Sequence, residues 1–253
     1  MDRRMPRIII LFLFACAIAG ERAQGIDVLV PGVSLESVSL VPGARVSYLV
    51  KSESFGATDS SYVELRVLDH KGGAFRLEIV SSPYPRSKEG SVTIRLRLAE
   101  RVTSISSPRE FRSCLQEILI REGAGAFRAP TGTELEDLDI EAIFIRPDDH
   151  ALRTALGPAR IATPAGVFLC DGVELARRET RPVSLGGVQT EREEEEMSRV
   201  WISRDVPFWG LVKCTVEKKT LTKAPGARAR GERPRVTRTE SILLSYRTPR
   251  GHS

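Results

Sequence analysis

The sequence predicts a mainly β protein (α+β): a curved antiparallel sheet, or open half-barrel, covered by one or two amphipathic helices. Three observations predict it. The first half alternates apolar and polar residues, a segment near the middle changes to helical spacing, and the second half returns to strand-like runs. The chain has 253 residues, of which 41% are hydrophobic and 28% charged. These proportions are typical of a folded globular protein.

Four successive segments of the first half are apolar on one face only. Apolar residues occupy alternate positions within residues 46–50, 63–67, 75–79 and 92–98. Polar turns such as Asp69–Gly73 separate them. Strands of this kind, joined by short turns, are typical of an antiparallel meander with one buried face.

A helix is expected after the meander. Ser107 and Glu110 have the spacing of a capping box, and Pro108 occupies the first helical position. Apolar residues then follow at helical intervals over Phe111–Leu119, and Gly123 ends the run. We expect this helix to lie across the apolar face of the sheet.

The second half is expected to contain more strands. Residues 133–144 fit either a helix capped by Thr133 and Glu136 or a strand, and Asp148–Leu156 is expected to form a short helix ended by Gly157-Pro158. The Glu-rich residues 190–196 are expected to be a solvated loop or an edge. Strands are expected over residues 160–163, 167–176, 199–203, 210–221 and 236–246.

The first twenty-five residues have the order of a secretory signal. Arg3, Arg4 and Arg7 precede an apolar run over Ile8–Ile18, and small residues follow. This run is shorter than the roughly 20 residues that a membrane-spanning helix needs, so we expect no transmembrane helix in the mature chain. The expected organisation is a signal peptide over residues 1–25 and a single β-rich domain over residues 26–253, with a flexible basic loop at residues 223–235.

Three cleavage sites compete in this segment. Cleavage after Ala19 or after Gly25 follows the small-x-small pattern. Alternatively, Leu13–Cys16 resembles the lipobox of bacterial lipoproteins, which implies cleavage before Cys16 and acylation of its thiol. We therefore expect an exported protein that is periplasmic or associated with the outer membrane.

The remaining cysteines are Cys114, Cys170 and Cys214. In an oxidising compartment, the simplest arrangement of these three cysteines is one disulfide and one buried free thiol. Cys170 and Cys214 both lie in expected strands and are the candidate disulfide. No CxxC pair is present, which argues against a redox or zinc role.

Charge and motifs exclude several classes of function. The formal net charge is +5, of which +2 comes from Arg3, Arg4 and Arg7 against Asp2. This weak basicity, together with export, argues against a nucleic-acid partner. The sequence lacks the HExxH, GxSxG and GxxxxGK[ST] motifs. We therefore expect no catalytic residues, metal ligands or cofactor.

Two passages are more distinctive than the rest, at residues 163–175 and 199–217. The second places Trp201, Phe208 and Trp209 at one corner, as a ligand mouth or membrane-facing rim. Alternatively, Trp201 fills the core while Phe208 and Trp209 cover a sheet edge. Both passages resemble stretches of exported bacterial proteins of unknown function that have an incomplete β-barrel. That architecture is similar to the outer-membrane lipoprotein carrier and receptor proteins of the LolA and LolB type.

The resemblance implies an open barrel whose concave face can hold an acyl chain. Our leading hypothesis is therefore an exported, non-enzymatic envelope protein that binds lipid or another apolar ligand. An alternative is an envelope scaffold or interaction module without a cavity, which binds a protein partner through an exposed edge or the basic loop. A hydrolase, suggested only by Ser203 and Asp205 beside a turn, is a third alternative.

Overall fold

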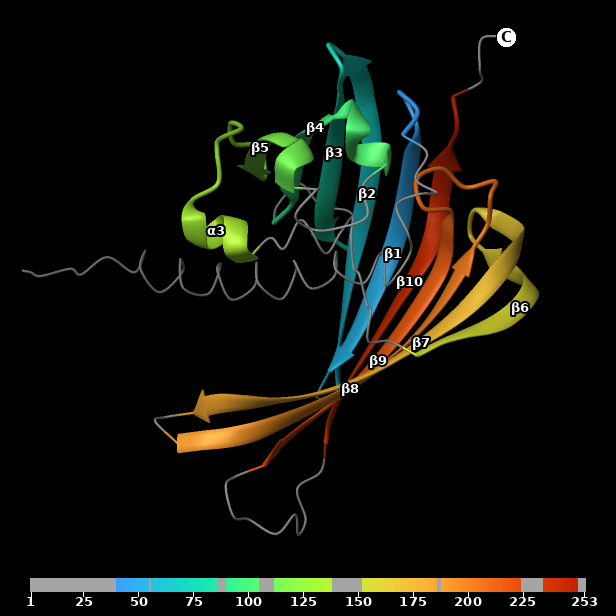
Figure 1. Ribbon diagram of the computed structural model, residues 1–253. Coiled ribbons are helices and arrows are strands. Elements are labelled where there is room, and N and C mark those ends of the chain that lie inside the picture. The colour runs from blue at the N-terminus through green and yellow to red at the C-terminus, as the bar shows by residue number, and fades with distance from the viewer. Residues whose placement is uncertain are drawn as a thin grey trace, which may run out of the picture.

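The computed structural model describes residues 40–54, 56–85, 90–104, 112–137, 152–185, 188–223 and 234–249. Its main element is an antiparallel ten-stranded sheet with the order β5-β4-β3-β2-β1-β10-β9-β8-β7-β6 (Figure 1). This order consists of two meanders, one from each half of the chain, which meet where the first strand pairs with the last. The antiparallel sheet that the sequence predicts is confirmed.

The first meander contains five strands and a short 3-10 helix. Each strand pairs with the next. Two residues lie between β1 and β2 and between β2 and β3, residues 84–91 lie between β3 and β4, and η2 and further residues separate β4 from β5. Its elements are β1 (Arg45–Ser54), β2 (Ala57–Lys71), β3 (Ala74–Pro83), β4 (Val92–Ala99), η2 (Glu100–Ser104) and β5 (Leu115–Glu122).

The second meander follows the short helix α3 (Gly132–Asp137) and contains longer strands. Its hairpin of β7 and β8 extends well beyond the other strands, as Figure 1 shows. Its strands are β6 (Leu152–Thr163), β7 (Gly166–Leu185), β8 (Val188–Ile202), β9 (Leu211–Lys223) and β10 (Arg235–Arg247).

The two meanders join along the pairing of β1 with β10, which runs over the whole length of β1. Hydroxyl side chains supplement the backbone ladder along this seam. The Ser52 and Thr239 hydroxyl oxygens lie 3.0 Å apart, and those of Ser47 and Ser245 lie 2.6 Å apart. Among the described strands this is the pair that links the two halves, so the seam holds the sheet together.

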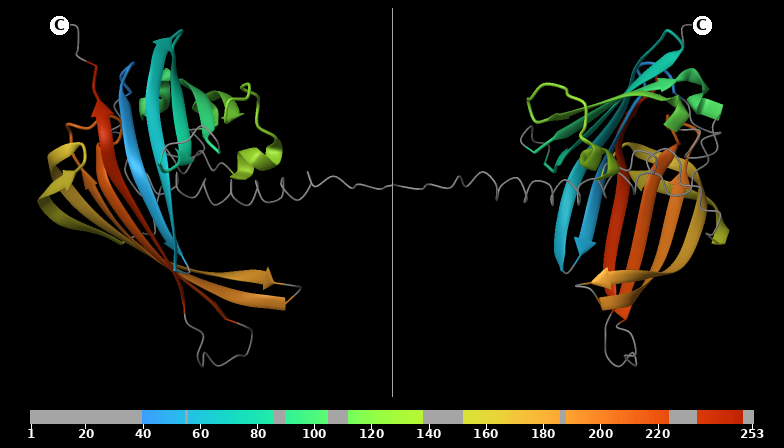
Figure 2. Two further views of the ribbon diagram at one scale, coloured as in Figure 1. Left: turned by 180° about the vertical axis from the view of Figure 1, so that it is seen from behind. Right: turned by 60° about the vertical axis from the view of Figure 1, so that its left-hand side comes forward.

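The sheet is curved but not closed, with β5 and β6 as its two edges (Figure 2). The register places Val50, Ser241, Cys214 and Val200 in one row across four strands, and all four are buried. Buried residues of both meanders form one continuous hydrophobic cluster. The one-sided alternation of the strands therefore produces a single core, on the concave side of the sheet.

The outer face of the first meander carries a row of ion pairs. Glu64, whose side chain is fully buried, contacts Arg45 at 2.5 Å and also pairs with Arg66. Arg66 lies 3.5 Å from Glu78, which in turn lies 3.0 Å from Arg95. Each carboxylate thus lies between two guanidinium groups, which compensates its loss of hydration.

The expected covering helices are not found in the part of the chain that the structure describes. Helical structure there is limited to η2, one turn at residues 112–114 and the six residues of α3. The predicted helix over Phe111–Leu119 is wrong from Leu115 onward, because β5 begins at this residue and pairs with β4. The expected cap at Ser107–Glu110 lies outside the described residues.

Pairing explains why this segment is a strand despite its helical spacing. Ile118 lies opposite Leu96 and Ile120 opposite Ile94, so alternate apolar residues extend the buried face of β4. An open edge of β4 would leave its backbone donors and acceptors without partners, and β5 supplies them. Tertiary pairing therefore overrides the local helical pattern.

Two further expectations need correction in the second half. The predicted helix over Asp148–Leu156 is wrong from Leu152, where β6 begins, and residues 148–151 lie outside the described part. Gly157 adopts a φ of 77° at a bulge, and Pro158 sits in an edge strand, where a missing N–H is tolerated. Residues 190–196 are not a loop or an edge, because β8 pairs with β7 and β9 on its two sides.

The helix α3 has a capping box two residues earlier than expected. The Glu134 N–H donates to the Thr131 hydroxyl at 3.3 Å, and the Thr131 N–H donates to the Glu134 carboxylate at 2.8 Å. Hydrogen bonds from Arg128, which has the larger effect, and from Thr131 lower the pKa of Glu134 to about 2. Thr131 and Glu134 therefore form the box that we assigned to Thr133 and Glu136.

Tyr48 ties the two meanders together across the concave side. Its buried hydroxyl donates to the backbone carbonyl of Leu211 at 3.1 Å. Tyr48 belongs to β1 and Leu211 to β9, with β10 between them. This hydrogen bond therefore spans the seam and favours the curvature of the sheet.

We expect Tyr48→Phe to lower the free energy of unfolding by about 1–2 kcal/mol, because it leaves a buried carbonyl without its donor. Chemical denaturation monitored by circular dichroism measures this change. Tyr246→Phe is the matched control, since Tyr246 lies in β10 and is partly exposed. Equal stability of wild-type and Tyr48→Phe proteins would show that the tie contributes nothing.

Candidate functional site

The apolar concave face continues beyond the buried core. Val173 lies opposite Val200, while Leu175 and Val216 flank Ser198 on its two sides. All three apolar side chains are only half-buried. Together they form an apolar strip on β7 and β9, at the border between the core and the more polar far end of the concave face.

The aromatic corner lies in the loop between β8 and β9. Phe208 and Trp209 are each 2% exposed, and their ring centroids are 5.7 Å apart. Trp201 is half-buried and packs against the core from β8. Phe208 and Trp209 therefore lie in the core, and the three aromatic residues do not form the exposed ligand mouth or rim that we considered.

A constrained backbone holds this corner in place. The Ser203 N–H donates to the Gly210 carbonyl at 2.8 Å, which closes the loop. Phe208 has a φ of 64° and Gly210 a φ of 73°. A Cβ atom on Gly210 would lie 2.6 Å from the Ser203 carbonyl oxygen, so only glycine fits there.

The cysteines are free, buried thiols in the structure. Cys170 lies on β7 and Cys214 on β9, and β8 runs between them. Neighbouring strands are about 4.8 Å apart, so two strands with a third between them are about 10 Å apart. A disulfide needs its two Cα atoms within about 7 Å of each other. The Cys170–Cys214 disulfide that we expected is therefore not formed. Cys16 and the rest of residues 1–39 lie outside the described residues.

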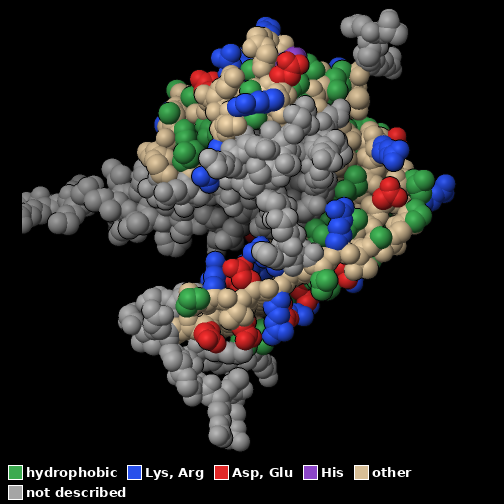
Figure 3. Space-filling model, in the orientation of Figure 1, with side chains coloured by type: hydrophobic (Ala, Val, Ile, Leu, Met, Phe, Trp, Pro, Cys, Tyr) green, Lys and Arg blue, Asp and Glu red, His purple; other side chains and the backbone are tan. Residues whose placement is uncertain are grey.

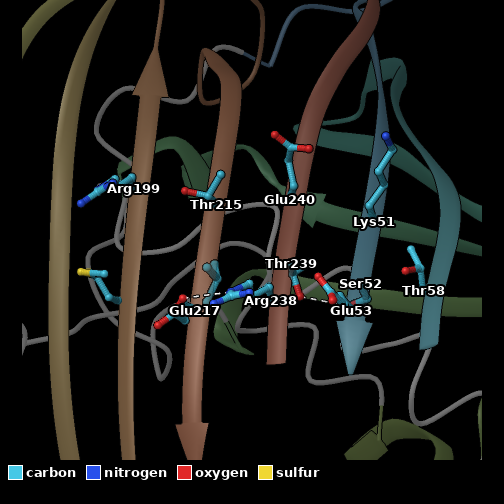
Figure 4. A pocket seen from close by; sticks show the side chains of 12 residues that line it. Lys51, Ser52, Glu53, Thr58, Arg199, Thr215, Glu217, Arg238, Thr239 and Glu240 are labelled. Carbon is cyan, nitrogen blue, oxygen red and sulfur yellow. Dashed lines mark hydrogen bonds and ion pairs between the residues drawn. The ribbon is translucent and has the colours of Figure 1, made fainter. Parts of the chain in front are cut away.

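A groove of about 370 Å³ lies on the outer face, opposite the core (Figure 4). Its main side chains alternate along their strands with the buried row of Val50, Ser241, Cys214 and Val200, so they point away from the core. The lining residues are Lys51, Ser52, Glu53, Thr58, Met197, Arg199, Thr215, Val216, Glu217, Arg238, Thr239 and Glu240.

Opposite charges alternate across this groove. Arg238 donates to Glu217 at 3.0 Å, and this hydrogen bond, followed by that from Lys219, holds the pKa of Glu217 below its ordinary value. Two other lining residues pair with groups outside the groove: Glu240 lies 2.8 Å from Lys213, and Arg199 donates to Glu174 at 2.8 Å. The groove charges thus largely neutralise one another, as on a solvated sheet face.

The Glu-rich part of β8 is stabilised by basic residues on its neighbouring strands. Glu194 lies 3.1 Å from Arg181 of β7 and 2.8 Å from Lys218 of β9. Glu195 lies 3.5 Å from Arg178. The acidic run is therefore compatible with a central strand, because both flanking strands supply cations.

The described residues contain little that suggests catalysis. They include no group of three or more His, Cys, Asp or Glu side chains that could hold a metal ion. The Ser203 hydroxyl accepts a hydrogen bond from the Asp205 N–H at 3.5 Å, so these residues form a turn. His70 stacks on Phe75, with ring centroids 4.3 Å apart.

In the described part of the chain, no helix is long and apolar enough to cross a membrane.

No protein-family profile and no curated protein matches the sequence. Solved structures similar to this one include a proposed lipoprotein from Parabacteroides distasonis, with 12% identity and a TM-score of 0.38. The match covers 86% of this chain and all of that chain.

Two other solved structures are of exported or carrier-like proteins. One is a proposed exported protein with a YmcC-like fold from Bacteroides fragilis, with 10% identity, a TM-score of 0.34 and coverage of 83% and 98% of the two chains. The other is a LolA superfamily protein from Nitrosomonas europaea, with 8% identity, a TM-score of 0.25 and coverage of 91% and 94%. The chain therefore has structural neighbours of the kind that its sequence resembles.

Sequence reasoning missed the outer groove and the half-buried strip. The alternation of Lys51 and Glu53 with Val50 and Ser52 already placed these charges on the outer face. Their proximity to Arg199 and Arg238 depends on the order of β1, β10, β9 and β8, which no local pattern reveals.

We expect Gly210→Ala to lower the free energy of unfolding by about 3 kcal/mol, because it adds backbone strain and a clash with the Ser203 carbonyl. Gly56→Ala is the matched control, since Gly56 has a φ of 74° but no neighbouring atom within 4 Å of the added Cβ. Its expected cost is about 1 kcal/mol. Denaturant titrations measure both values, and equal losses would show that close packing at the corner is unimportant.

Proposed function

We propose that this protein is an exported, non-enzymatic binding protein of the bacterial envelope that takes up lipid or another apolar ligand on its concave face. The observation that carries this proposal is the half-buried strip of Val173, Leu175 and Val216, which continues the core on an open curved sheet. Apolar side chains left partly open at the border of a concave face are typical lining residues of a ligand site.

The shape of the sheet supports an elongated ligand. Because β5 and β6 remain edges, the sheet does not enclose its concave side completely. An acyl chain lying along the strip would cover the three apolar side chains, and each buried CH₂ would contribute about 0.8 kcal/mol. The hydroxyls of Ser198 and Thr239 lie on the same face and supply a polar border.

The envelope location rests on the amino-terminal pattern. The basic residues Arg3, Arg4 and Arg7, followed by the apolar run and the small residues, favour export. If Cys16 is acylated, the mature protein is anchored to a membrane surface, whereas cleavage after Ala19 or Gly25 leaves it unanchored.

We expect the protein purified from the periplasm to carry an apolar ligand, detected as extra mass by native mass spectrometry. It should also bind a dansyl-labelled fatty acid. Leu175→Asp should weaken binding of this probe about tenfold, because it places a carboxylate against the acyl chain.

Ala176→Asp is the matched control, because Ala176 is the next residue of β7 and points to the outer face. Circular dichroism confirms that both variants are folded. A ligand-free wild-type protein that does not bind the probe would contradict the proposal. So would an equal loss of affinity in the two variants.

A further inference from the structure

The start of β7 is apolar on both of its faces. Phe168 and Cys170 are buried in the core, whereas Val167 and Leu169 are each 68% exposed on the opposite face. Strands with continuous apolar runs are typical of sheets covered on both sides. The exposed side chains at the start of β7 therefore lack the cover that their composition favours. Because the register of β7 has no bulge, Val167 and Leu169 lie on the same face of the strand as Val173, and they continue the apolar strip toward the edge of the sheet.

The exposed apolar surface extends onto β6. Ala162 lies opposite Val167, and Pro158 lies opposite Asp171. Figure 3 shows hydrophobic side chains beside charged ones along the margin formed by β6 and β7. We call this surface the β6–β7 patch; it comprises Pro158, Arg160, Ala162, Val167, Leu169 and Asp171.

Two opposite charges lie within the β6–β7 patch. Arg160 is directly opposite Leu169, and Asp171 is two residues further along β7 on the same face. Both side chains are exposed, and neither forms an ion pair with another described residue. A surface that carries both charges beside an apolar centre is complementary to a second copy of itself.

The edge of β6 is not suited to pairing with another strand. Pro158 has no N–H to donate, and the bulge at Gly157 distorts the strand. Natural sheets use both features to prevent addition of strands at an edge. A partner is therefore expected to pack against the face of the hairpin, not to extend the sheet.

We propose that the β6–β7 patch is the interface of a two-fold symmetric homodimer. Val167 and Leu169 of the two copies pack against each other, and Arg160 of each copy pairs with Asp171 of the other. A two-fold axis makes each contact occur twice, so one opposite-charge pair supplies two ion pairs. The patch spans only two strands and is smaller than a standard interface, so the dimer dissociates on dilution.

Sedimentation velocity over a series of concentrations tests this proposal on the purified protein. We expect the wild-type mass to rise towards that of a dimer. Arg160→Asp and Asp171→Arg should each weaken association about tenfold, because each places like charges opposite one another. The double variant Arg160→Asp/Asp171→Arg should restore association, since it exchanges the charges while preserving their complementarity.

Leu169→Ser should also weaken association, whereas Leu135→Ser should not. Leu135 is a suitable control because it is 44% exposed but lies on α3. Circular dichroism verifies the fold of each variant. A wild-type protein that stays monomeric at every concentration would overturn the proposal. A monomer that floats with vesicles of phosphatidylethanolamine and phosphatidylglycerol would also overturn it, and would indicate a lipid surface as the partner. A double variant as weak as the two single variants would exclude the proposed pairing.

Discussion

The need to bury one apolar face determines the shape of this protein. Ten strands present alternating apolar side chains to the same side, and the described part of the chain contains no helical layer to cover them. The sheet therefore curves, so that residues of its two halves bury one another in one cluster. The pairing of β1 with β10 makes this possible, and the hydrogen bond from Tyr48 to Leu211 joins strands on either side of β10. The open strip of Val173, Leu175 and Val216 lies where this mutual cover ends.

The outer face is organised by a different interaction. Cross-strand ion pairs replace apolar contacts there, from the buried Glu64 between its two arginines to Glu194 between Arg181 and Lys218. Because most of these charges are paired within the sheet, the outer groove offers few uncompensated groups to a charged ligand. The β6–β7 patch differs from this outer face, since apolar residues predominate in the patch and its two charges are unpaired within the described residues.

Alternation predicted the first four strands of the first meander because each has one buried face, as in the run of Val63, Leu65 and Val67. The prediction failed where the same residues fit both helical and strand spacing. Leu115, Ile118 and Leu119 fit a helix as well as a strand, and only the open edge of β4 decides between them. The Glu-rich strand failed for a related reason, because its stability depends on cations more than twenty residues away in β9. The aromatic corner was recognised as a corner, but the burial of Phe208 and Trp209 depends on a loop conformation that requires Gly210.

The seam between β1 and β10 joins segments that are far apart in the sequence. Arg45 of β1 lies opposite Arg247 of β10 in the strand register. β1 therefore cannot pair with β10 until the segment that forms β10 has been synthesised. Contacts between residues so distant in sequence slow folding, because a large loop must close before they form. Until then, β1 presents an unpaired edge and an apolar face to its surroundings. The same strand arrangement that completes the sheet thus delays its completion until the carboxyl-terminal strand has arrived.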